Sequence, residues 1–101
     1  MEQFFRDLLS KMFGLWNEII SKPEYEIDIA LTDFKRLKVI AEVKWKKKVS
    51  KREIEKIERV FSNFDCRKIL IVPDRKALEK EPKGIEVWDV GKILKEIKKI
   101  S

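Results

Sequence analysis

The chain has 101 residues, 42% of them charged, and a formal net charge of +6 at pH 7. This length suits a single domain with one core of modest size, so we expect residues 1–101 to fold as one unit. The chain has no histidine and only three glycines, which excludes Ser-His-Asp and Cys-His catalysis, HExxH zinc sites and both glycine-rich nucleotide-binding loops.

The N-terminal segment has the pattern of an amphipathic helix. Apolar residues recur at three- and four-residue spacing from Phe4 to Phe13, which predicts a helix that ends at Gly14. The next segment, residues 15–20, is ambiguous, because it fits either a first strand or a continuation of the helix. If it is a strand, residues 21–23 would turn it back into the segment that follows.

Two segments alternate apolar and polar residues with the period of a strand. In residues 25–31 and again in residues 37–45 the odd positions are apolar, so we expect both strands to turn their odd positions inward. A short connection at residues 33–36 makes them an antiparallel hairpin, and one register of this hairpin sets Asp28 opposite Glu42. Two facing carboxylates repel each other, and a divalent cation is their natural compensation.

The following segments predict a helix and a buried strand. Ser50 and Glu53 match a capping box, which starts a helix whose apolar stripe continues to Phe64. The apolar run 68–72 ends at Pro73 and is typical of a strand that is covered on both faces. A strand, a helix and a buried strand in this order predict a crossover to a parallel neighbour.

The C-terminal part predicts a loop, a strand and a helix. Residues 74–83 read as a surface loop with room for one helical turn, and residues 85–88 as a short last strand. Asp89 is placed to cap a final helix. The expected inward residues of this helix are Val90, Ile93, Leu94, Ile97 and Ile100. The predicted fold is therefore α/β, in the order α-β-β-β-α-β-β-α, with a mixed sheet and helices packed on it.

The residues that survive elimination favour carboxylate, lysine and hard-metal chemistry. Mg²⁺ or Mn²⁺ takes oxygen ligands, which Asp28 and Glu42 could supply, with the backbone carbonyl of Val43 as a third. Lys44 falls on the same strand face as Glu42, where it could position an attacking water or stabilise the transition state of phosphodiester hydrolysis. The alternative is that Glu42 and Lys44 are ordinary exposed residues on a solvated sheet face.

The sequence also resembles a known superfamily. Residues 26–30 (Glu-Ile-Asp-Ile-Ala), followed by residues 42–45 (Glu-Val-Lys-Trp), are similar to the motif of the PD-(D/E)xK nucleases. The predicted element order matches the core of that superfamily over nearly the whole chain. The similarity is greatest to archaeal Holliday-junction resolvases and to the nuclease-like C-terminal domain of archaeal ATPases of uncharacterised role. One departure is Ile27, which stands where the motif has proline.

The resemblance implies a restriction-endonuclease-like fold and a Mg²⁺- or Mn²⁺-dependent nuclease. It makes Asp28 and Glu42 the metal ligands and Lys44 the catalytic lysine. It also implies an acid on the first helix as a further metal ligand, for which Glu2 is the best match and Glu18 the fallback. Because Glu2 lies so near the start of the chain, an excised domain or a shortened relative is a further possibility.

A basic run begins at the proposed site. Six of the nine residues from 44 to 52 are basic, which predicts contacts with a DNA backbone or, alternatively, a solvated loop. The proposed DNA-binding residues are Lys46, Lys47, Lys48, Lys51 and Arg52. Trp45, Trp16 and Trp88 are expected in the core.

Two functions fit these features. The first is a phosphodiester hydrolase that acts on DNA, including branched DNA. The alternative is a non-catalytic nucleic-acid-binding or docking module derived from an archaeal ATPase. A homodimer and an ATPase domain in a longer parent chain are further expectations. The single Cys66 favours a reducing cytoplasm, the absence of a long apolar run argues against a membrane segment, and the many charges with few amides are typical of thermophiles.

Overall fold

The computed structural model describes residues 2–34 and 36–100, and over this range the predicted order of helices and strands is confirmed. The elements are α1 (Glu2–Phe13), β1 (Trp16–Ser21), β2 (Glu26–Asp33), β3 (Arg36–Val43), α2 (Lys51–Phe61), β4 (Arg67–Ile71), the 3-10 helix η1 (Arg75–Ala77), β5 (Glu86–Trp88) and α3 (Val90–Ile100). The ambiguous segment 15–20 is therefore a strand. Lys35 in the predicted hairpin connection and the side chain of Ile100 lie outside what the structure describes.

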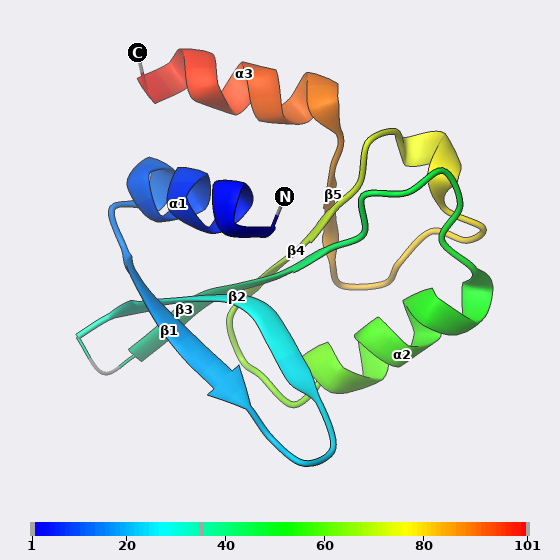
Figure 1. Ribbon diagram of the computed structural model, residues 1–101, viewed down its shortest axis with the longest axis horizontal. Helices are drawn as coiled ribbons and strands as arrows, with labels where there is room; N and C mark the ends of the chain where they lie inside the picture. Colours follow the sequence, from blue (N-terminus) through cyan, green and yellow to red (C-terminus); the bar gives the residue numbers. More distant parts are fainter. Residues whose placement is uncertain (1, 35, 101) are drawn as a thin grey trace.

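The five strands form one mixed sheet in the order β1-β2-β3-β4-β5. The first three strands are antiparallel to one another, whereas β4 is parallel to both β3 and β5. This arrangement confirms the predicted hairpin and the predicted crossover through α2. Helices α1 and α3 lie on one face of the sheet and α2 on the other (Figure 1). The molecule is thus an α/β fold in three layers.

The central strands of the sheet are buried on both faces. Even-numbered residues of the central strands, such as Ala30, Ile40 and Leu70, belong to a core cluster under α2. Their odd-numbered neighbours, such as Ile29 and Val39, belong to a second cluster under α1 and α3. The even face is therefore a packed layer, so the alternative of a solvated face does not hold along the middle of the strands.

A β-bulge interrupts β2 at Asp28. The register of β1 on β2 shifts by one residue between two partner pairs, which are Glu18 with Ala30 and Ile20 with Ile27. Asp28 and Ile29 therefore both face Ile19, which is the two-against-one pairing of a bulge. The extra residue shifts the alternation of the strand by one position, so odd-numbered residues before the bulge and odd-numbered residues after it point to opposite faces.

This reversal corrects one expectation from the sequence. Tyr25 and Ile27 pack in the cluster under α2, whereas Ile29 and Leu31 pack in the cluster under α1 and α3. The expectation that all odd positions of this strand share one face was wrong. An alternating pattern in the sequence shows which residues are apolar, but a bulge adds a residue to one strand without disturbing that pattern.

The local signals for the helices are confirmed. The hydroxyl of Ser50 accepts a hydrogen bond from the backbone of Glu53, whose carboxylate accepts one from the backbone of Ser50, and this is the predicted capping box. At the start of α3, Oδ1 of Asp89 accepts a hydrogen bond of 2.9 Å from the backbone N–H of Lys92. These caps fix the first turns of α2 and α3.

Other burial predictions were wrong in part. Trp88 is buried as expected, but Trp16 on the edge strand β1 is 77% exposed, and Trp45 is 37% exposed beside the ring of Phe5. Phe4 in α1 and Val90 and Leu94 in α3 are also exposed. Helical spacing places a residue on the apolar side of a helix, but it does not show how far the sheet extends beneath it.

The predicted surface loop after β4 is partly built into the core. Ala77 in η1 is buried, and Leu78 forms an isolated bridge with Val49, which lies in the connection between β3 and α2. Within the described residues, no helix combines the length and the apolar character needed to span a membrane.

Candidate functional site

Asp28 and Glu42 lie side by side at one end of the β2–β3 hairpin. The regular register of the two strands runs to Ile29 opposite Ala41, and the next step brings Asp28 next to Glu42. The carboxylate of Glu42 accepts a hydrogen bond from the backbone of Asp28. In return, Oδ2 of Asp28 accepts a hydrogen bond of 3.0 Å from the backbone N–H of Val43. The proximity that the sequence predicted is therefore present.

The bulge explains why the carboxylate of Asp28 can lie beside Glu42. The backbone carbonyl of Asp28 accepts a hydrogen bond of 3.0 Å from Nη2 of Arg6, a residue of α1. Bulges commonly turn a side chain away from the regular direction of its strand. Glu42 is the last residue but one of β3 and lies beside Leu70 of the parallel strand β4. The site thus lies where the carboxyl end of β3 meets the irregular part of β2.

The charge on Glu42 is costly in this position. Its side chain is 17% exposed, and burial together with the nearby charge of Asp28 raises the pKa of Glu42 to about 7. Lys44 opposes this shift, with its Nζ 3.8 Å from Oε2 of Glu42. One ammonium at this distance leaves the pair of carboxylates incompletely compensated.

A third acid approaches the pair from α1. Glu2 makes a side-chain hydrogen bond to Asp28, and burial together with that contact raises the pKa of Glu2. Arg6 holds the other side of Glu2, with Nη2 at 3.0 Å from Oε2. Glu18, the alternative first acid, lies on exposed strand β1 opposite Ala30. The structure therefore favours Glu2 over Glu18 as the partner of Asp28.

The donor set fits a hard cation that keeps much of its water. Among residues 2–34 and 36–100, no group of three or more histidine, cysteine, aspartate or glutamate residues has the arrangement of a metal site. Mg²⁺, however, is often held by one or two carboxylates and completes its shell with water and substrate oxygens. Asp28 and Glu42 supply two such carboxylates, and their mutual repulsion is the kind that a cation relieves. The N–H group of Val43 is bound to Asp28, and the role of the Val43 carbonyl as a third metal ligand stays a prediction.

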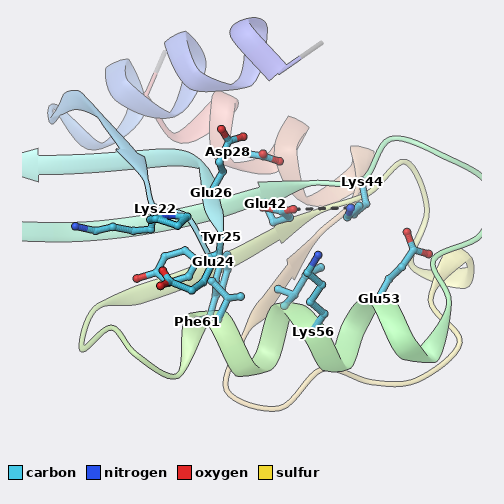
Figure 2. A pocket seen from close by; sticks show the side chains of 13 residues that line it. Lys22, Glu24, Tyr25, Glu26, Asp28, Glu42, Lys44, Glu53, Lys56 and Phe61 are labelled. Atoms are coloured by element: carbon cyan, nitrogen blue, oxygen red, sulfur yellow. Dashed lines mark ion pairs between the residues drawn. The ribbon is translucent and has the colours of Figure 1, made fainter.

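A pocket of about 630 Å³ opens beside this pair. Its walls come from the β1–β2 turn, the two central strands and α2 (Figure 2). The charged residues that line it are Glu24, Glu26, Asp28, Glu42, Glu53, Lys22, Lys44 and Lys56. The apolar part of the wall includes Tyr25, Ile57 and Phe61. A volume of this size is typical of small-ligand sites and exceeds what one hydrated ion needs.

Sequence reasoning missed several of these lining residues. Lys56 and Glu53 come from α2, and Lys22 and Glu24 come from the β1–β2 turn. A helix that crosses from β3 to a parallel neighbour must pass over the sheet, so the sequence did contain a signal that α2 covers one side of the site. The position of the turn depends on the bulge and had no such signal.

The basic run after Lys44 is partly neutralised by its own ion pairs. Lys46 pairs with Glu53, and Lys48 pairs with Glu79 at 3.0 Å. The side chains of Lys47, Lys51 and Arg52 are exposed and have no ion pair within the described part of the chain. None of these five basic residues lines the pocket. The run therefore lies next to the site and carries less free charge than its sequence suggests.

Comparison with known proteins adds no family to this description. No family model, no curated protein and no solved structure gives a significant match to the chain. What the protein does is therefore inferred from the geometry and chemistry of the pocket.

Proposed function

We propose that this chain is a Mg²⁺- or Mn²⁺-dependent phosphodiester hydrolase that acts on DNA, built on a restriction-endonuclease-like variant of the α/β fold. The observation that carries the proposal is the pair of Asp28 and Glu42 on adjacent strands, held together although the pKa of Glu42 rises to about 7. Such a pair is unfavourable for stability alone. Perturbed carboxylates that line a pocket are frequent at functional sites.

Each residue at the site has a role in this proposal. A bound divalent cation would activate water and stabilise negative charge on the scissile phosphate. Asp28 and Glu42 would hold that cation, while Glu2 and the N–H group of Val43 keep the carboxylate of Asp28 in place. Lys44, 3.8 Å from Glu42, stabilises charge that develops on the phosphate oxygens.

The direct test is cleavage of linear, nicked and branched DNA with Mg²⁺, with Mn²⁺ and with EDTA. Glu42→Gln should remove cleavage but keep the fold, because an amide is a poorer ligand than a carboxylate for a hard cation. Glu24→Gln is the matched control, since Glu24 lines the same pocket at the β1–β2 turn, away from the pair. Cleavage by the wild type in EDTA, or equal cleavage by Glu42→Gln, would contradict the proposal.

A second function, a non-catalytic DNA-binding or docking module of an archaeal ATPase, is favoured by one observation. Among the described residues, no three acidic, histidine or cysteine side chains are arranged so that together they could hold one metal ion. In that case the wild type would bind DNA without cutting it under any metal condition. A cytoplasmic location, a homodimer and an attached ATPase domain accompany either proposal, and sedimentation of the purified chain would test the dimer.

A further inference from the structure

Lys56 enters the pocket from the wall opposite the carboxylate pair. It belongs to α2, and Figure 2 shows its side chain extending from the helix towards Glu42 and Lys44. Lys22, by contrast, extends away from the carboxylates at the other end of the pocket in the same view. Lys56 is therefore the lysine that faces Glu42 across the cavity.

The ammonium of Lys56 has no partner of its own. Within the part of the chain that the structure describes, its side chain makes no hydrogen bond and no ion pair. Two lysines near it are paired, Lys44 with Glu42 and Lys46 with Glu53. A lysine that reaches towards a glutamate without pairing to it leaves its charge available to a ligand between the two.

The helix holds Lys56 in a fixed position. The next residue, Ile57, is 6% exposed and belongs to the core cluster under α2, as do Ile54 and Phe61. The capping box at Ser50 fixes the first turn of the same helix. The backbone that carries Lys56 is therefore rigid, and only its side chain adapts to a ligand.

The charges in the pocket decide where an anion can bind. Five carboxylates and three lysines line it, so an anion that enters is repelled by the Asp28 and Glu42 wall unless a cation lies between. The opposite wall is where a positively charged side chain holds an anion without displacing that cation. Lysine is a frequent phosphate ligand because its ammonium acts as a point charge with three donors.

We propose that Lys56 binds a phosphate of the DNA strand from the α2 wall and so positions the scissile phosphodiester against Asp28 and Glu42. This inference rests on the proposed function, since it assumes that the ligand is a nucleic-acid strand. Lys56 is then a substrate-binding residue, with a role distinct from that of Lys44. Loss of its charge should weaken binding first, and slow cleavage through poorer positioning of the phosphate.

The test measures binding rather than turnover. Fluorescence anisotropy of labelled branched DNA is recorded at several salt concentrations, with Ca²⁺ and again with EDTA. Lys56→Ala should reduce the slope of log affinity against log salt by about 0.9, which corresponds to one lost phosphate contact. Lys56→Arg should restore most of the slope. Lys56 and Arg59 are both exposed residues of α2, but Arg59 does not line the pocket, so Arg59→Ala removes one charge and should change the slope less.

The outcomes separate the two proposals. An unchanged slope in Lys56→Ala, a change equal to that of Arg59→Ala, or a wild type that does not bind DNA would overturn the role of Lys56. Cleavage is assayed separately: a wild type that never cuts DNA, but whose slope falls in Lys56→Ala, overturns the hydrolase and supports Lys56. Cleavage that persists with an unchanged slope overturns Lys56 alone.

Discussion

The buried charge of Glu42 predicts an unusual dependence of stability on pH. When a carboxyl group has a higher pKa in the folded state than in the unfolded state, the folded state binds more protons between the two values. For Glu42 these values are the ordinary 4.5 and about 7. The contribution of Glu42 to the free energy of unfolding is therefore fully present below pH 4.5, and it is lost as the pH rises through about 7. The metal-free protein should therefore weaken across the range in which most proteins are steady.

The size of the effect follows from the shift. Raising the pKa of Glu42 from 4.5 to about 7 corresponds to about 3 kcal/mol between its protonated and ionised forms, as an upper limit. Glu2, whose pKa is also raised, acts in the same direction. The chain has no histidine, so no imidazole titrates in the same window. A loss of this size would lower the melting temperature by about 10 °C or more.

The assay is guanidinium unfolding in EDTA at pH 5, 6, 7 and 8, for the wild type and Glu42→Gln. The free energy of unfolding of the wild type should fall with pH, while that of the variant should stay nearly level. Glu86→Gln is a control of opposite sign, because Arg67 lowers the pKa of Glu86 through two hydrogen bonds. Glu86→Gln should change the pH dependence of stability only below about pH 4.5, where the carboxyl group of Glu86 becomes protonated. Parallel profiles for the wild type and Glu42→Gln between pH 5 and 8 would refute the reasoning.

Three further predictions concern metal binding, the helix cap and the basic run. Asp28→Asn should leave the metal-free protein equally stable or more stable, by up to about 1 kcal/mol. Mg²⁺ should raise the melting temperature of the wild type but not of this variant. An equal rise in both proteins would show that Asp28 does not bind the metal. Ser50→Ala should cost about 1 kcal/mol in urea unfolding, since it removes the side-chain cap of α2, and an unchanged midpoint would contradict this. In salt-dependent DNA binding, Lys47→Ala should reduce the slope more than Lys46→Ala, because Glu53 already pairs with Lys46; equal slopes would show that this ion pair opens on binding.

Signals that depend on near neighbours in the chain were the ones that predicted the fold. Ser50 and Glu53 are three residues apart, and their capping box fixed the start of α2 as expected. The apolar run 68–72 likewise gave a strand buried on both faces. The ambiguity at residues 15–20 arose because a short edge strand buries little, so its sequence carries only a weak pattern.

The core of the site could be predicted because it needs only two strands and one turn. The register of that hairpin brings Asp28 and Glu42 together, and Lys44 follows from its spacing to Glu42. The pocket could not be predicted, because Lys56 and Lys22 come to line it only through the packing of α2 on the sheet and the position of the β1–β2 turn. The prediction that Trp16 is buried was wrong for a related reason. The sequence of a strand does not show whether the helix layer extends far enough to cover it.

The bulge at Asp28 adds a residue that neither core layer needs. Deleting Asp28 would restore unbroken pairing between β1 and β2, because Ile20 and Ile27 already form a pair beyond the bulge. Tyr25 and Ile27 would keep their places in the layer under α2, and Ile29 would keep its place under α1 and α3. A lineage that lost the function could therefore discard the extra residue together with the Asp28 carboxylate, at little cost to the core. The irregular strand should last only as long as the chemistry does, and a bulge retained at this position would be a sign that the site is still in use.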